Sequence, residues 1–225
     1  MRPPRKAARR TSPAHRAPLR PSRSLRLRLA SFTLIELLTV IAVIAILAAI
    51  VLVAAGYVQN KGAQSRALSE VQAMENACEQ YKADNGAYPR ASGTGNSVTD
   101  TLYAKTMGDP ASAYATNYQA ASLYLYTALT GDTNGYGIAT VSYFPIKPAM
   151  CSRPNTSLAI SSTNAVQYLM DPWGNSYGYS TAGEVSGTTA AITGYNPTFD
   201  LWSTGGTITT GSAPSSTTYQ WIKNW

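Results

Sequence analysis

The feature that most constrains this chain is an uninterrupted apolar run over residues 37–55. The run contains no charged residue and no proline, and Thr39 carries its only strongly hydrogen-bonding side chain. At a rise of about 1.5 Å per residue, roughly 20 helical residues cross the hydrocarbon core of a bilayer, which is about 30 Å thick. The run therefore predicts a helix that is long enough and apolar enough to span a membrane.

One ionisable residue, Glu36, lies at the start of this run, five residues after Ser31 and without a cation beside it. Ionisable groups inside apolar membrane segments are rare and usually functional. Among helices packed together without water, an unpaired carboxylate needs a cationic partner. We therefore expect Glu36 to set the register between subunits of an assembly. The alternative is a solvated carboxylate that the helix dipole favours.

The charge of the chain is divided unevenly along its length. Residues 1–31 hold ten of the eighteen Lys and Arg residues and no acid. The other eight basic residues stand against eleven acids, so the remainder has a net charge of −3. Because Lys and Arg accumulate on the cytoplasmic side of membrane helices, this basic leader predicts a cytoplasmic N-terminus and an extracytoplasmic body. We expect no nucleic-acid partner, because the body has no basic excess.

The predicted helix continues beyond the apolar run. Gly56 and Gly62 weaken it locally, and Asp84-Asn85-Gly86 ends it, with Gly86 as a left-handed cap before Pro89. The predicted helix of residues 32–84 is apolar all round in the segment 32–56 and amphipathic in the segment 57–86. Steps of three and four define the apolar face of the second segment, which comprises Ala63, Ala67, Leu68, Val71, Met74, Cys78 and Tyr81. Glu70 is among the polar residues assigned to the opposite face.

Residues 87–170 form a variable insertion, and residues 171–225 form a β-sheet region. A helix is predicted near residues 112–130 of the insertion, with Gly131 closing it and one apolar face of Tyr114, Tyr118, Ala121, Leu125 and Leu129. A short strand is predicted at 138–144. Residues 132–137 carry oxygen-bearing side chains at alternate positions, as the first residues of a calcium-binding loop do. Tyr136, however, stands where such a loop has an acid, so we predict a turn.

Little in the sequence indicates catalysis. The only histidine, His15, lies in the leader, and the chain has neither a phosphate-binding glycine motif nor an adjacent pair of acids typical of hydrolases. We therefore predict that the protein is not an enzyme. Cys78 and Cys151 could form a disulfide in an extracytoplasmic body, and the alternative is two unrelated buried thiols.

Residues 31–47, SFTLIELLTVIAVIAIL, resemble the prepilin signature of type IV pilins and of type II secretion pseudopilins. The resemblance implies that a membrane peptidase cuts between Ser31 and Phe32, removes the leader 1–31 and methylates the new Phe32 amine. This amine would then be the cation nearest to Glu36. The family usually has glycine where this chain has Ser31.

A second resemblance covers DPWGNSYGY at 171–179, FDLWSTGG at 199–206 and WIKNW at 221–225, which are similar to the major pseudopilin of type II secretion. In that family the strand leads into a calcium-binding loop. Here Thr207 stands where an aspartate is usual, and Asp200 is the only acid nearby. We therefore expect no tight calcium site and no other cofactor, with Asp200 as the sole candidate ligand.

The resemblances imply an α+β, pilin-like fold, in which the long N-terminal helix packs on a small C-terminal antiparallel sheet and a helix-containing insertion lies between them. They imply a structural subunit of a secretion pseudopilus, single-pass in the bacterial inner membrane with a periplasmic body. Its expected partners are other copies of itself, minor pseudopilins, the prepilin peptidase and the inner-membrane assembly platform. The alternatives are a type IV or minor pilin for adhesion, motility or DNA uptake, and an anchored or secreted binding module. A secreted module would have a signal peptide ending at Val53-Ala54-Ala55.

Overall fold

The computed structural model describes residues 33–91, 98–107, 110, 114–138, 140, 142–184, 194–206 and 220–225. The chain divides into two units, Met1–Ala49 and Ile50–Trp225. The predicted leader, including Ser31, and its neighbour Phe32 lie outside the described residues.

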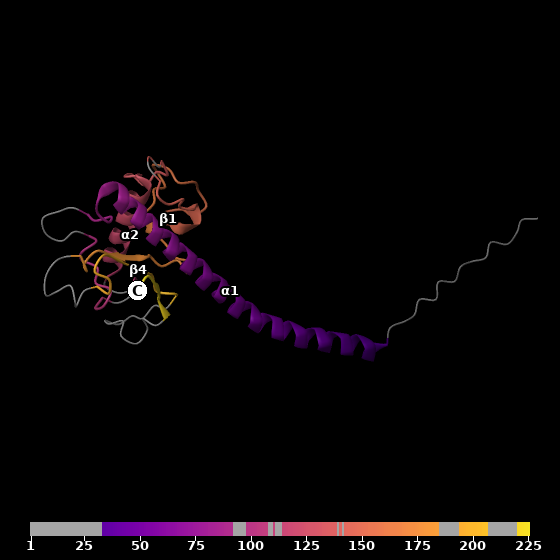
Figure 1. The fold of residues 1–225 in the computed structure, drawn as a ribbon. Coiled ribbons are helices and arrows are strands. Elements are labelled where there is room, and N and C mark those ends of the chain that lie inside the picture. Colours follow the sequence, from indigo (N-terminus) through magenta and orange to yellow (C-terminus); the bar gives the residue numbers. More distant parts are fainter. Residues whose placement is uncertain are drawn as a thin grey trace, which may run out of the picture. The chain divides into compact units, whose positions relative to one another are not determined.

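The first element is helix α1, Leu34–Asn85, which has 52 residues and agrees with the predicted helix to within two residues at each end (Figure 1). Its helical structure continues through Gly56 and Gly62. Gly86 follows it with a φ of +79°, and the Gly86 amide donates to the Lys82 carbonyl at 2.7 Å. The predicted left-handed cap is therefore confirmed.

The second half of α1 buries much of the predicted face. Ala67, Val71, Met74 and Cys78 are buried as expected. Leu68, predicted to be buried, is 46% exposed, and Glu70, predicted to face solvent, is only 8% exposed. The buried stripe follows steps of three and four residues from Ala67, and these steps reach Glu70. They miss Leu68, whose side chain is rotated by about 100° around the helix axis from that of Ala67.

Helix α2, Ala115–Thr130, confirms the helix predicted in the insertion, and Gly131 ends it with a φ of +69°. Tyr118, Ala121, Leu125 and Leu129 form its buried face. The sequence predicts that this helix belongs to an insertion between the long helix and the sheet. In the structure α2 packs beside strands β2 and β3, whose bounds follow, so the insertion supplies part of the core (Figure 1).

Within the described residues, the strands form two small antiparallel sheets. In the first, β1 (Cys151–Ser152) pairs with β2 (Tyr168–Leu169), directly after the 3₁₀ turn η1 (Pro148–Met150). The second sheet has the order β3-β4-β5, from Gly178–Ser180, Asp200–Ser203 and Ile222–Lys223. The C-terminal region is therefore an antiparallel sheet, as predicted, and the chain belongs to the α+β class.

The prediction of a strand at residues 138–144 is wrong. Residues 139 and 141 lie outside the described residues, and none of the others in this range is in a strand. The amide of Tyr143 donates to the carbonyl of Leu129 at 2.9 Å, so the backbone here bonds to the end of α2. A strand needs a continuous ladder of such bonds with a neighbour.

The larger core cluster combines side chains from α1, α2 and the three-stranded sheet. Its members include Val71, Met74, Cys78, Leu125, Leu129, Tyr177, Tyr179 and Leu201. A smaller cluster is built around Trp202, whose ring stacks on that of Trp221 at 5.8 Å between centroids. A Cβ at Gly178 would overlap the Trp202 ring, so the sheet requires glycine at this position.

Candidate functional site

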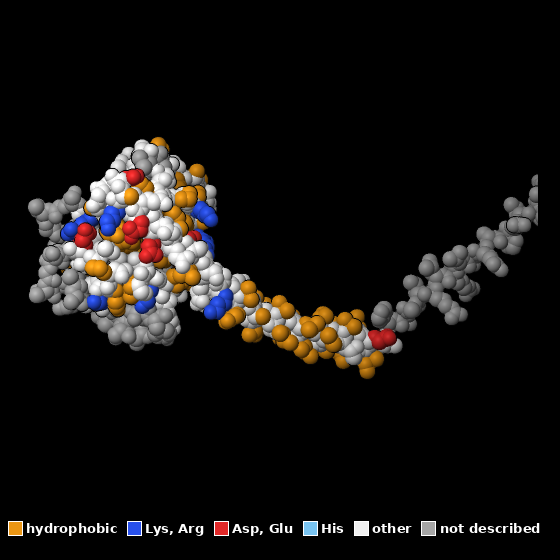
Figure 2. All heavy atoms as spheres, in the orientation of Figure 1, with side chains coloured by type: hydrophobic (Ala, Val, Ile, Leu, Met, Phe, Trp, Pro, Cys, Tyr) orange, Lys and Arg blue, Asp and Glu red, His pale blue; other side chains and the backbone are white. Residues whose placement is uncertain are grey.

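The most exposed apolar surface is the apolar segment, residues 34–58 of α1. Sixteen large hydrophobic side chains in it are each at least 51% exposed (Figure 2). By length and composition, this helix could cross a membrane. Soluble proteins rarely leave so large an apolar surface uncovered, and such surfaces are typical of membrane or protein interaction sites.

Glu36, the single carboxylate of the apolar segment, is bonded to Thr33 at the start of the helix. Its Oε2 accepts hydrogen bonds from the Thr33 amide at 2.9 Å and from the Thr33 hydroxyl at 2.7 Å. In return the Glu36 amide donates to Thr33 Oγ1 at 3.3 Å. This reciprocal pattern is a capping box, which the sequence spacing Thr-x-x-Glu could have revealed and which the sequence analysis missed. The register role predicted for Glu36 stays a prediction.

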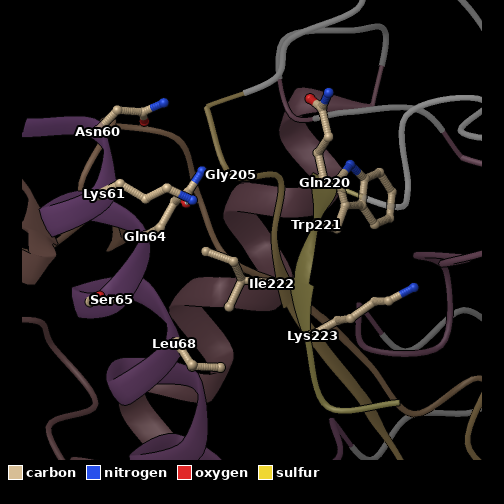
Figure 3. Close-up of a pocket in the computed structure, with 10 residues that line it drawn as sticks. All are labelled: Asn60, Lys61, Gln64, Ser65, Leu68, Gly205, Gln220, Trp221, Ile222 and Lys223. Atoms are coloured by element: carbon tan, nitrogen blue, oxygen red, sulfur yellow. The ribbon is translucent and has the colours of Figure 1, made fainter. Parts of the chain in front are cut away.

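Just beyond the apolar segment, a groove of about 740 Å³ lies between α1 and β5. Figure 3 shows Lys61, Gln64 and Leu68 of α1 projecting towards β5, with Ile222 of β5 projecting towards α1. Trp221 and Lys223 project to the other side of the strand (Figure 3). The residues that line the groove are Asn60, Lys61, Gln64, Ser65, Leu68, Gly205, Gln220, Trp221, Ile222 and Lys223.

The buried Glu70 joins α1 to the three-stranded sheet. Its Oε2 accepts from the Tyr177 hydroxyl at 2.6 Å, just before β3, and its Oε1 pairs with Arg66 Nε at 2.6 Å. Burial, followed by the bond to Glu70, raises the pKa of the Tyr177 hydroxyl, which therefore stays protonated as a donor. Sequence periodicity misassigned Glu70 because its partner lies 107 residues away.

Both cysteines are among the described residues, and both are free, buried thiols in the larger core cluster. The disulfide that the sequence allows between Cys78 and Cys151 is therefore not formed in this structure. Burial raises the pKa of the Cys151 thiol to about 11, which keeps it protonated near neutral pH.

The aspartates considered as calcium ligands accept hydrogen bonds from backbone amides. Asp200, the candidate ligand, accepts the amides of Tyr195 and Asn196, each at 2.8 Å, and burial raises its pKa. Asp132 accepts the amides of Tyr136 at 3.1 Å and Gly137 at 2.6 Å, which confirms the predicted turn.

Across the part of the chain that the structure describes, no three or more His, Cys, Asp or Glu side chains gather as a metal site would require. Thr207 lies outside these residues, so the expectation of no calcium site in its loop stays a prediction.

Comparisons of the chain with protein-family models, with curated proteins and with solved structures found no match. What the chain does has to be inferred from its own residues. The features that bear on this inference are the apolar segment, the capping box at its start and the groove beyond its end.

Proposed function

We propose that this protein is a pilin-like structural subunit of a bacterial secretion pseudopilus. The observation that carries the proposal is the apolar segment, an unbroken helix with sixteen exposed hydrophobic side chains and a single carboxylate at its start. Such a helix can be covered by lipid in the free subunit and by neighbouring helices in a filament. The protein therefore acts by assembly, and catalysis has no part in the proposal.

The leader is removed in this proposal by cleavage between Ser31 and Phe32, and the Phe32 amine is methylated. Thr33 and Glu36 both follow the cut, so the capping box belongs to the mature chain. The Thr33 and Glu36 amides accordingly find their partners within the mature chain.

The orientation follows from charge. Ten basic residues precede the apolar segment, whereas the chain from residue 32 onwards has a net charge of −3. The positive-inside rule then keeps the leader in the cytoplasm, where the peptidase cuts, and puts the body in the periplasm.

In the filament, Glu36 pairs with the Phe32 amine of its own or a neighbouring subunit and sets the register. The Thr33 amide and hydroxyl donate hydrogen bonds to one oxygen of the Glu36 carboxylate. Both donors are neutral, so they do not balance its charge. A charged carboxylate in a dry helix bundle still needs an opposite charge, because an uncompensated buried ion is strongly destabilising. Polymerisation therefore favours the arrangement that brings an amine to each Glu36.

The C-terminal body supports a secretion pseudopilin over an adhesive or DNA-uptake pilin. The turn after Asp171 and strand β4 lie in two of the three segments that resemble the major pseudopilin. A 2.6 Å hydrogen bond joins them, from the Ser203 hydroxyl to the Asp171 carboxylate. That carboxylate also accepts the amides of Trp173 at 3.0 Å and Asn175 at 2.9 Å. DNA uptake would favour a basic body, and this body is mildly acidic.

Mass spectrometry of the N-terminus tests the processing step. In cells that contain a prepilin peptidase, we expect a mature chain that begins with methylated Phe32. A chain beginning at Gly56 would identify a secretory signal peptide, and an uncut leader would identify a simple anchor. Either result would contradict the proposal.

Electron microscopy of filaments tests the role of Glu36. We expect Glu36→Ala to abolish filaments while leaving membrane insertion intact. Asp84→Ala, which removes an exposed carboxylate from the same helix, should form filaments normally. Thr33→Ala separates capping from register: if it abolishes filaments as completely as Glu36→Ala, Glu36 acts through the helix cap and the register role is wrong.

A further inference from the structure

The groove between α1 and β5 begins where the apolar segment ends. Val58 is the last exposed apolar residue of the segment, and Asn60 and Lys61, the second and third residues after it, begin the groove. At about 1.5 Å per residue, Lys61 lies roughly 5 Å further along the helix axis than Val58. The polar layer on each side of a bilayer is about 5–8 Å thick. With residues 37–58 in the bilayer, Lys61 is therefore at the depth of the lipid headgroups.

The lining of the groove is basic although the body is acidic. Its ten residues include Lys61 and Lys223 and no Asp or Glu. Among the described residues, no carboxylate lies within ion-pair distance of Lys61, whose ammonium donates to the neutral Gln64 side chain at 3.3 Å. Lys223 lies at the edge, on the other side of β5, 5.0 Å from the Trp225 ring (Figure 3). Lys61 is thus the cation that faces an occupant.

The groove is polar at one end and apolar at the other. Asn60, Lys61 and Gln64 line the end next to the apolar segment, whereas Leu68 and Ile222 face each other further along α1 (Figure 3). An anionic group entering the groove is stabilised at the Lys61 end and excluded from the Leu68 end, where it would lose hydration without gaining a partner. The arrangement holds an anion close to the membrane surface.

Two aromatic side chains accompany the polar end. Trp173 Nε1 donates to Asn60 Oδ1 at 3.2 Å, and the Lys61 ammonium lies 5.8 Å from the Tyr57 ring centroid. Trp and Tyr are enriched at membrane–water interfaces, where the ring meets the lipid and the polar group meets the headgroups. This neighbourhood fits a lipid surface.

We propose that the polar end of this groove binds the headgroup phosphate of an anionic phospholipid from the leaflet next to the body. Lys61 supplies the charge, and the side-chain amides of Asn60 and Gln64 supply hydrogen bonds. The inference rests on the membrane insertion proposed above and adds a lipid partner that helix insertion alone does not require. A bound headgroup holds the body at a defined height on the membrane before assembly.

The test uses the full chain in detergent, titrated with phosphatidylglycerol or phosphatidylcholine and observed by native mass spectrometry. We expect the protein to retain phosphatidylglycerol in preference to phosphatidylcholine. Lys61→Gln should weaken the binding of phosphatidylglycerol about five-fold, because one basic residue near an anionic lipid surface contributes an affinity of about this size. Lys147→Gln removes an exposed lysine outside the groove and should bind like the unmodified chain. Inorganic phosphate should show no Lys61-dependent binding at comparable concentrations, which separates a lipid from a free anion.

Equal binding of the two lipids would overturn the lipid site. So would equal loss in the two lysine variants, or Lys61-dependent binding of inorganic phosphate as strong as that of lipid. If Lys61→Gln instead abolishes cross-links between copies and leaves lipid binding unchanged, the occupant is a second subunit. Alkaline extraction of cell membranes is run in parallel. Release of the protein would overturn both membrane insertion and the lipid site, whereas retention with no lipid preference would overturn the lipid site alone.

Discussion

The two halves of α1 belong to one continuous helix but differ in how much of their apolar surface the rest of the chain buries. Residues 34–58 expose every large hydrophobic side chain, whereas Val71, Met74 and Cys78 are almost completely buried in a cluster with residues of α2 and the sheet. The described residues of the body leave the first half uncovered. The second half is stabilised by partners that the same chain supplies. This contrast separates variants that affect assembly or insertion from variants that affect folding of the body.

The largest expected effect on folding comes from the second half. Met74→Ala removes a fully buried side chain and should lower the free energy of unfolding of the body by about 2–5 kcal/mol. Ile46→Ala, at a position that is 62% exposed, should change it by less than about 0.5 kcal/mol. Denaturant titration of the full chain in detergent, followed by tryptophan fluorescence, measures both, because all four tryptophans lie in the unit Ile50–Trp225. Equal losses would contradict the contrast between the two halves.

Membrane insertion should show the reverse pattern. Val43→Arg places a charge near the centre of the apolar segment and should disfavour insertion by about 3 kcal/mol, without changing the stability of the body. Asn76→Arg, on the exposed side of the second half, should insert normally. Alkaline extraction of membranes reports insertion. Normal insertion of the Val43→Arg chain would contradict a cost of this size at residue 43.

The bond between Glu70 and Tyr177 gives an intermediate effect. Tyr177→Phe removes one partner of a buried hydrogen bond and should cost the body about 1–3 kcal/mol. Tyr57→Phe, in the first half and 67% exposed, should have almost no effect.

The same tyrosine also predicts a pH dependence. Because the folded state raises the pKa of Tyr177 above its ordinary value of 10.0, the folded chain retains a proton that the unfolded chain releases. The contribution of this hydroxyl is complete below pH 10 and declines as the pH rises above that value. Denaturant titrations at pH 9–11 should show a shallower decline for Tyr177→Phe, and an unchanged decline would contradict this assignment.

The smallest effects concern two glycines of opposite expected sign. Gly62 lies inside the helix and an added Cβ would meet nothing within 4 Å, so Gly62→Ala should stabilise the body by about 0.5–1 kcal/mol. Gly86 has a φ of +79°, and Gly86→Ala should destabilise it by about 1–2 kcal/mol. Thermal unfolding checks both. A stabilising Gly86→Ala variant would show that the left-handed cap is dispensable.

Much of α1 and α2 could be predicted from sequence because helix signals are local. The apolar run, the face of Tyr118, Leu125 and Leu129, and the terminating glycines Gly86 and Gly131 all act through neighbours within a few residues. The capping box between Thr33 and Glu36 was equally local, and its spacing was available to be read.

The features that sequence reasoning missed depend on partners far along the chain. The burial of Glu70 requires Tyr177, the packing of α2 requires β2 and β3, and the groove requires β5 to lie beside residues 60–68 of α1. The sequence by itself determined that this protein has a helix long and apolar enough to span a membrane, because length and apolar character are properties of consecutive residues. Only the tertiary structure decided which charges are buried and which lysine faces the groove, because those properties depend on long-range packing.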